Sequence, residues 1–251
     1  MKLTFTGKTG LIIGGGGEIS LALAYKMAET GLFPILTYRS PKSLERINAV
    51  LEGVPTGFMA FPLNLSNRES IETMLFEIEK NGLEGPDYAA DLAQGDFERL
   101  IASADDGDTH KYFEENITSK AALIKALARR MLPRKFGRLV YVSSAAAVRL
   151  NPGQGLYAAS KQAVETLYRA LGVELGGHGI TTASLRLGYV DAGRGRRFLS
   201  SAPEVLIRKT PLGRALTTEE AAGMILFLLS DQALGVNATE VVMDGGLCAG
   251  K

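Results

Sequence analysis

The sequence has few cysteines and histidines and no excess of either charge, and each shortage excludes a class of protein. Its only cysteine, Cys248, cannot form an internal disulfide and suits a reducing compartment, so we expect a cytoplasmic protein. The 2 histidines do not combine with Cys248 into a metal-binding pattern, and we expect no metal. The 28 basic residues balance 27 acidic ones, which does not favour a nucleic-acid partner.

Long apolar runs and flexible linkers are also missing. Residues 1–10 lack the apolar core of a signal peptide, and the longest apolar stretch, residues 221–229, is too short to span a bilayer. We therefore expect no membrane partner. No segment rich in proline or serine divides the chain, so we expect a single domain over residues 1–251.

Short strand-like runs alternate with longer segments of helical period, which predicts a parallel sheet covered by helices on both faces. In such α/β folds, ligands bind beyond the carboxyl ends of the strands. Strands are expected near residues 9–13, 34–38, 57–63, 87–92, 138–142, 180–187 and 240–243. Helices are expected up to residue 30 and near residues 43–51, 66–80, 108–131, 155–175 and 218–230.

Four consecutive glycines, Gly14–Gly17, stand between the first expected strand and the first expected helix. Glycines here let the backbone approach a pyrophosphate, and the N-terminal end of the helix offers free N–H groups to it. The plainer alternative is a flexible turn. The position near the start of an alternating α/β pattern favours a dinucleotide site.

The second expected strand ends in Tyr38-Arg39-Ser40, without an acidic residue. An NAD-binding protein places a carboxylate at this point to bind the ribose diol, whereas an arginine suits the 2′-phosphate of NADPH. Arg39 therefore favours NADPH over NADH, although a solvated loop arginine is the simpler alternative.

The strongest local pattern is Tyr157-Ala-Ala-Ser-Lys161, preceded by Ser144 at the end of a strand. Residues four apart share a face of a helix, so the Lys161 ammonium is expected to lower the pKa of the Tyr157 phenol. The strand-to-helix connection would bring Ser144 alongside, where its hydroxyl can bond a substrate oxygen. An ordinary amphipathic helix is the alternative for the tyrosine–lysine spacing alone.

Together these residues resemble the short-chain dehydrogenase/reductase family over nearly the whole chain, and are most similar to its 3-oxoacyl-acyl-carrier-protein reductases. The resemblance implies a Rossmann-type, doubly wound, three-layer α/β/α fold and a homotetramer or homodimer. It also implies four catalytic residues, because Asn116 matches the family's active-site asparagine and joins Ser144, Tyr157 and Lys161.

The resemblance further implies a cofactor site and a substrate site that share the catalytic tyrosine. The cofactor-binding residues would be Gly14, Gly16, Gly17, Ile19, Arg39, Ser40, Asn64, Leu65, Ala93, Gln94, Tyr157, Lys161, Gly188 and Val190. The substrate-binding residues would be Ser144, Arg149, Asn151 and Tyr157.

Several cofactor positions depart from the family pattern. Glu18 stands within the glycine motif, which ends in Ser20-Leu21-Ala22 and so is similar to that of enoyl-acyl-carrier-protein reductases. We expect Glu18 to face solvent or to pair with a base such as Arg39. Arg194–Arg197 either supply compensating positive charge or form a solvated loop.

The leading hypothesis is NADPH-dependent reduction of a 3-oxoacyl thioester, carried by an acyl carrier protein in fatty-acid or polyketide synthesis. Lys135 matches a position that carrier-protein reductases use to contact the acidic carrier, although a helix C-terminus favours cations in any case. Arg186 lies in an otherwise apolar strand and is expected to pair with Asp191 or to lie at a subunit contact.

Two alternatives stay open. The first is a different substrate, either an enoyl thioester or a free ketone or alcohol. The second is a non-catalytic member of the family that has lost tight cofactor binding. The spacing of Tyr157 and Lys161 together with Ser144 favours ketone chemistry over enoyl reduction. The presence of all four catalytic residues, Asn116 included, speaks against the non-catalytic alternative.

Overall fold

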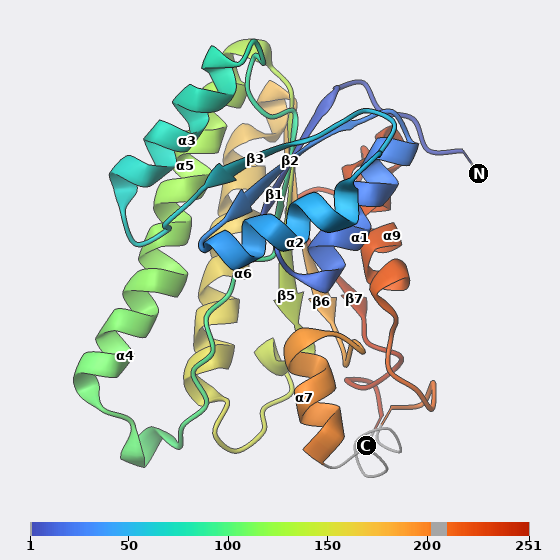
Figure 1. The fold of residues 1–251 in the computed structure, drawn as a ribbon. Coiled ribbons are helices and arrows are strands. Elements are labelled where there is room, and N and C mark those ends of the chain that lie inside the picture. Colours follow the sequence, from blue (N-terminus) through green and yellow to red (C-terminus); the bar gives the residue numbers. More distant parts are fainter. Residues whose placement is uncertain (1, 202–209, 251) are drawn as a thin grey trace.

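The computed structural model describes residues 2–201 and 210–250, and its strands form one parallel sheet (Figure 1). The strand order is β3-β2-β1-β4-β5-β6-β7, and every neighbouring pair is parallel. The predicted doubly wound sheet is therefore confirmed. The strands are β1 (Thr9–Ile13), β2 (Phe33–Tyr38), β3 (Met59–Pro62), β4 (Tyr88–Asp91), β5 (Gly137–Ser144), β6 (Ile180–Leu187) and β7 (Thr239–Met243).

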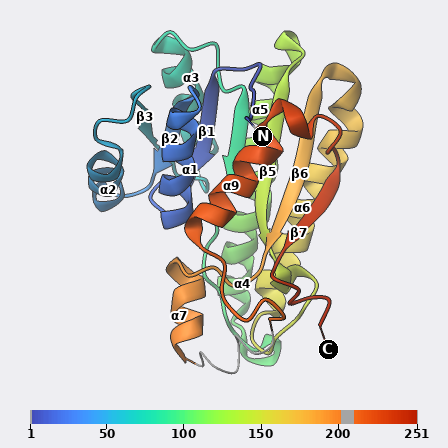
Figure 2. The ribbon, with the colours of Figure 1, turned by 90° about the vertical axis from the view of Figure 1, so that its right-hand side faces the viewer.

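Helices cover both faces of this sheet, as the alternating pattern predicts (Figures 1 and 2). One face carries α1 (Glu18–Glu29), α2 (Pro41–Leu51) and α9 (Thr218–Leu229). The other carries α3 (Arg68–Lys80), α5 (Ser119–Met131) and α6 (Gly155–Leu175). α7 (Gly193–Ser201) lies beyond the carboxyl ends of the strands.

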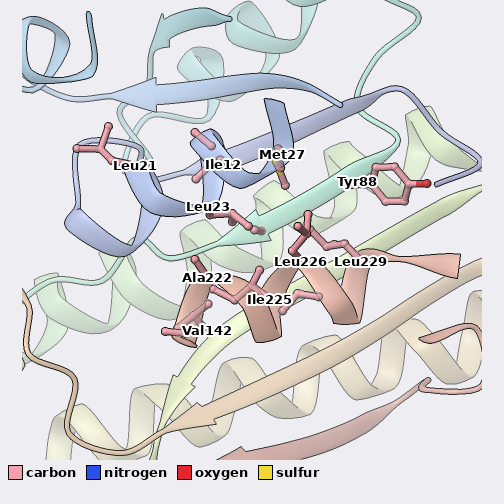
Figure 3. Close-up of a cluster of buried hydrophobic side chains, with 14 of the residues drawn as sticks. Ile12, Leu21, Leu23, Met27, Tyr88, Val142, Ala222, Ile225, Leu226 and Leu229 are labelled. Carbon is pink, nitrogen blue, oxygen red and sulfur yellow. The ribbon is translucent and has the colours of Figure 1, made fainter. Parts of the chain in front are cut away.

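Two apolar clusters join the helices to the sheet, one on each face. In the cluster of Figure 3, Ile12 of β1 packs with Leu23 and Met27 of α1 and with Ile225 of α9, all fully buried. Such close packing holds the ends of the strands at fixed distances from one another. The loops that follow the strands are therefore anchored on a rigid layer.

Two helical segments differ from expectation. Residues 108–131 were expected as one helix, but α4 (Asp106–Phe113) and α5 are separated by a π-helical turn at Glu114–Thr118. α7 forms where no helix was expected, because two glycines in its first turn obscure the helical period. A Cβ at Gly195 would overlap the carbonyl oxygen of Val190, so this close approach needs a glycine.

No helix within residues 2–201 and 210–250 combines the length and the apolar character needed to cross a bilayer. The remaining elements start or end within a few residues of their expected bounds. The bounds of α6 and β6 agree with expectation at both ends.

The packing of α6 against the loop before β7 leads to a first prediction. A Cβ at Gly172 of α6 would overlap Thr182 Oγ1 and Asn237 Oδ1 and would lie 3.1 Å from the nitrogen of Ala238. We expect Gly172→Ala to lower the free energy of unfolding by about 1–3 kcal/mol, as overpacking does. Urea unfolding measures this change.

Gly223 supplies the matched control. It lies in α9, and a Cβ there would meet no atom within 4 Å. Gly223→Ala should therefore raise the free energy of unfolding by up to about 1 kcal/mol through helix propensity alone. Equal effects of the two substitutions would contradict the packing described for α6.

Candidate active site

A cavity of about 470 Å³ opens at the carboxyl ends of β1, β4, β5 and β6. Its lining includes the catalytic trio predicted from the sequence, Ser144, Tyr157 and Lys161. It also includes eight of the other predicted residues: Gly14, Gly17, Ile19, Gln94, Arg149, Asn151, Gly188 and Val190. Segments far apart in the sequence thus meet at the edge of the sheet where parallel α/β folds bind ligands.

Ser144 ends β5, and Tyr157 and Lys161 lie one turn apart near the start of α6. The Ser144 hydroxyl lies beside that of Tyr157, and its Oγ accepts from the nitrogen of Ala146 at 3.1 Å. Lys161 Nζ donates to the carbonyl oxygen of Val142 at 2.9 Å and lies 4.7 Å from the ring centre of Tyr141 and 5.7 Å from that of Tyr157. The two hydroxyls therefore line the cavity while the ammonium sits behind them.

The pKa of Tyr157 differs from expectation. Burial raises the pKa of Tyr157, and the neighbouring Ser144 hydroxyl offsets only part of that effect. Burial, together with the charge of Lys120, lowers the pKa of Lys161 to about 7. The expectation that Lys161 lowers the pKa of Tyr157 is thus wrong for this structure, because both side chains are desolvated. Tyr157 is held as a protonated acid.

A buried ion pair between Asp91 and Lys120 lies beneath the site and was not predicted from the sequence. Asp91 ends β4 and Lys120 lies in the first turn of α5; both side chains are at most 1% exposed. Lys120 Nζ also donates to the carbonyl oxygen of Ala93 at 2.7 Å, and Tyr168 OH bonds Asp91 at 3.4 Å. The feature of the sequence that could have indicated this ion pair is Lys120 itself, because a lysine on the apolar face of a helix needs a buried partner.

Asn116 lies in the π-helical turn and is 3% exposed. Its Nδ2 donates to the carbonyl oxygen of Tyr112 at 2.9 Å, and its Oδ1 accepts from the nitrogen of Gly95 at 2.8 Å. Asn116 thereby ties the π turn to the loop after β4. It is not among the residues that line the cavity.

Gln94 reaches the cavity wall through a small polar network. Its Nε2 donates to Tyr112 OH at 2.8 Å and to Ser160 Oγ at 3.2 Å, and its Oε1 accepts from Tyr141 OH at 3.4 Å. The amide is therefore already bonded on both sides. It braces the loop after β4 against α6.

The glycine turn packs closely against neighbouring segments of the chain, and this packing requires glycines. Gly14 has a φ of 85°, and a Cβ there would lie 3.0 Å from the backbone nitrogen of Ala93. A Cβ at Gly16 would lie 3.0 Å from Ser43 Cβ. Because one cavity extends from Gly14 to Tyr157, the site can hold an extended ligand along this edge of the sheet.

Six predicted cofactor residues are not among those that line the cavity: Gly16 and Ala93, which belong to the loops after β1 and β4, and Arg39, Ser40, Asn64 and Leu65. Arg39 and Ser40 follow β2, and Asn64 follows β3; all three are exposed. Leu65 is partly buried beside the core. The structure thus places them at neighbouring strand ends, outside the lining of the cavity itself.

Glu18 pairs with bases other than the one expected. Its carboxylate accepts from Arg196 Nη1 at 2.9 Å and from the nitrogen of Gly193 at 2.8 Å, and lies 3.7 Å from Arg46. The expected pairing with a base is therefore right, but the partner Arg39 is wrong. The carboxylate connects the glycine turn to the start of α7.

The arginines of α7 are not a free solvated cluster. Arg194 and Arg197 both pair with Asp96, and Arg196 Nε pairs with Asp191 at 2.8 Å. Most of their positive charge is therefore already matched within the chain.

Arg186 was expected to pair with Asp191 or to lie at a subunit contact, and the first of these two expectations is wrong. It forms a bidentate ion pair with the buried Glu165 of α6, in which Nε donates to Oε1 at 2.9 Å and Nη2 donates to Oε2 at 2.7 Å. Ser143 Oγ donates to the same carboxylate at 2.6 Å. The arginine thus joins β6 to α6 next to Ser144.

A family model described as enoyl-(acyl carrier protein) reductase matches residues 17–248. The chain is 30% identical over 241 residues to the 3-oxoacyl-(acyl-carrier-protein) reductase FabG of Haemophilus influenzae, covering 96% of this chain and 98% of that protein. It is 27% identical over 245 residues to the Escherichia coli protein of the same name, covering 98% and 99% of the two chains.

Solved structures are also similar to this chain over nearly its whole length. A chain described as a short chain dehydrogenase/reductase family protein has a TM-score of 0.86 at 26% identity, with 99% of this chain and 100% of that chain covered. A putative gluconate dehydrogenase from Agrobacterium tumefaciens has a TM-score of 0.93 at 20% identity, covering 99% of each chain, and shows the fold alone.

The buried pair beneath the site generates a second prediction. Lys120→Met would leave the Asp91 carboxylate buried without its charged partner, which typically costs about 3–5 kcal/mol. The double variant Lys120→Met, Asp91→Asn removes both charges and should recover much of that loss. Denaturant unfolding of the two variants measures the difference, and equal losses would contradict a compensated pair.

Proposed function

Because this chain belongs to the short-chain dehydrogenase/reductase family, we propose that it is an NADPH-dependent ketoreductase that converts a 3-oxoacyl thioester into the 3-hydroxyacyl product. The observation that carries this proposal is the pairing of the Ser144 and Tyr157 hydroxyls on one wall of the cavity, with Lys161 behind them. Two adjacent hydroxyl donors suit a ketone oxygen that gains negative charge as it is reduced.

Each of the four predicted catalytic residues has a role consistent with its environment. Tyr157 is protonated and donates its proton to the carbonyl oxygen, while Ser144 polarises that oxygen. Lys161 is available to return a proton to Tyr157, because its own pKa of about 7 lies near the working range. Asn116 positions the loop after β4 through its bond to Gly95.

The cofactor proposal rests on the fit of the glycine turn and on Arg39. NADPH, when bound, supplies the hydride. Arg39, exposed at the end of β2, would hold the 2′-phosphate beside Ser40. The other residues proposed to hold the cofactor are Gly14, Gly16, Gly17, Ile19, Asn64, Leu65, Ala93, Gln94, Tyr157, Lys161, Gly188 and Val190.

We propose an acyl carrier protein as the source of the substrate, on the names of the relatives. The basic residues Arg130 and Lys135, at and just after the end of α5, leave one positive charge, unpaired within the described residues, for an acidic carrier. Arg130 pairs with Glu72 and Glu79, so its charge is matched within the chain. Lys135 is exposed and forms no ion pair with any described residue.

The single domain over residues 1–251 and the cytoplasmic location stay proposals made from the composition, and the homotetramer or homodimer stays a proposal made from the family resemblance. The structure bears on one detail of the assembly. Leu123 and Leu127 of α5 are fully buried in the core of this chain. They are therefore not the apolar surface through which α5 would contact another subunit.

The second candidate is reduction of an enoyl thioester, which the description of the matching family model favours. An assay of NADPH oxidation with acetoacetyl and crotonyl thioesters separates the two activities. We expect turnover of the acetoacetyl thioester only. Turnover of crotonyl thioester alone would support the enoyl reductase, and NADPH titration without binding at millimolar concentration would support the non-catalytic alternative.

The proton-donor role of Tyr157 gives a third prediction. Tyr157→Phe keeps the ring beside Lys161 but removes the hydroxyl, so kcat with acetoacetyl thioester should fall by about 10²–10⁴-fold. NADPH binding, measured by fluorescence titration, should change little. Retained turnover in this variant would refute the mechanism.

Arg39 gives a fourth prediction, which concerns the choice of cofactor. Arg39→Ala should raise KM for NADPH about tenfold, because a charge-assisted contact with the 2′-phosphate is lost. KM for NADH should stay the same, since NADH has no such phosphate. Equal changes for the two cofactors would show that Arg39 does not read the 2′-phosphate.

A further inference from the structure

Arg194, the second residue of α7, lies directly against the proposed proton donor. Its Cζ is 4.5 Å from the ring centre of Tyr157, within the range of a cation–π contact. One nitrogen of the guanidinium, Nη2, donates to the carbonyl oxygen of Gly95 at 2.9 Å and pairs with Asp96. These contacts hold the group over the tyrosine in one orientation.

The other terminal nitrogen of Arg194 is not satisfied. Nη1 is buried and has no hydrogen-bond partner among the residues that the structure describes. A buried donor without an acceptor is costly and uncommon, and a ligand in the adjacent cavity is an ordinary source of the missing acceptor. Arg194 lines the same cavity as Ser144 and Tyr157.

A second arginine lines this cavity without a partner. Arg149 follows β5 and is partly buried, and its guanidinium forms no hydrogen bond or ion pair with any described residue. The three acidic side chains of the same lining have partners: Glu18 pairs with Arg196, Asp96 with Arg194 and Arg197, and Glu98 accepts from Gln154 at 3.4 Å. The two groups without a partner among the described residues, Arg194 Nη1 and the guanidinium of Arg149, are both hydrogen-bond donors.

We propose that Arg194, assisted by Arg149, binds a carboxylate on the acyl chain of the substrate, a few bonds from the carbonyl that Tyr157 protonates. The inference rests on the proposed reduction of a 3-oxoacyl thioester and narrows its substrate to a chain that ends in an acid. Arg194 Nη1 offers one charge-assisted N–H donor to a carboxylate, and the guanidinium of Arg149 can add others. A methyl group at the same position cannot accept these hydrogen bonds. Arg194 is therefore a specificity-determining residue.

Two thioesters of N-acetylcysteamine form a matched pair for the test. The 3-oxoadipyl chain carries a carboxylate at the sixth carbon, where the 3-oxohexanoyl chain carries a methyl group. Neither contains a phosphate, so the readout excludes binding of the phosphate that a natural carrier arm brings. We expect kcat/KM of the wild-type protein to be at least about tenfold higher for 3-oxoadipyl thioester.

Arg194→Met should bring the two kcat/KM values to within about threefold of each other, mainly by raising KM for the acidic substrate. Arg194→Lys should keep part of the preference because it keeps the charge. Arg169→Met removes an exposed arginine of α6 that pairs with Glu240, and it should leave the preference unchanged. This control separates a local contact from an effect of net charge.

Calorimetric titration with the non-reducible adipyl and hexanoyl thioesters tests the contact without turnover. If the adipyl thioester binds more tightly than the hexanoyl thioester, and if Arg194→Met removes this difference, the proposal is supported. It is supported even when neither oxo substrate is reduced, because failure of reduction overturns only the proposed activity. Equal binding and equal turnover of the two chains, or an equal effect of Arg194→Met on both, overturns the inference and leaves the proposed reductase standing.

Discussion

The buried ammonium of Lys161 is the constraint on which the site depends. Lys161 is 3% exposed, and a charge in that position is costly unless groups around it compensate. The compensation comes from the carbonyl oxygen of Val142 on β5 and from the ring of Tyr141. Because both belong to β5 while Lys161 belongs to α6, the strand and the helix must keep one fixed relation. This fixed relation also sets the positions of Ser144 on β5 and Tyr157 on α6.

The charges beneath the sheet edge act on one another. The positive charge of Lys120 opposes the protonation of Lys161, while Asp91 and Glu165 favour it. Asp91 is held by Lys120, and Glu165 is held by Arg186. Asp91 and Glu165 therefore each compensate a neighbouring cation and also raise the pKa of Lys161. Such an arrangement couples the stability of this layer to the chemistry above it.

The patterns that depend on neighbours along the chain were readable from the sequence. The alternating periods predicted the sheet, and the spacing of Tyr157 and Lys161 predicted their shared helix face. Which side chains pair across distant segments could not be predicted from the sequence. From the sequence, Arg39 was a candidate partner for Glu18, but the fold pairs Glu18 with Arg196 of α7 instead. The π turn at Glu114–Thr118 was missed for the same reason, because its asparagine, Asn116, accepts a hydrogen bond from Gly95, which lies 21 residues earlier in the sequence.

The most direct measurement of this account is the titration of the Lys161 side chain by NMR, with lysine isotope labels assigned through Lys161→Arg. The account predicts that the ammonium loses its proton as the pH rises through about 7, because burial and the charge of Lys120 disfavour the charged form. A pKa near the ordinary value of about 10.4 for lysine would contradict it. Such a value would mean that water reaches the group and that β5 and α6 do not enclose it.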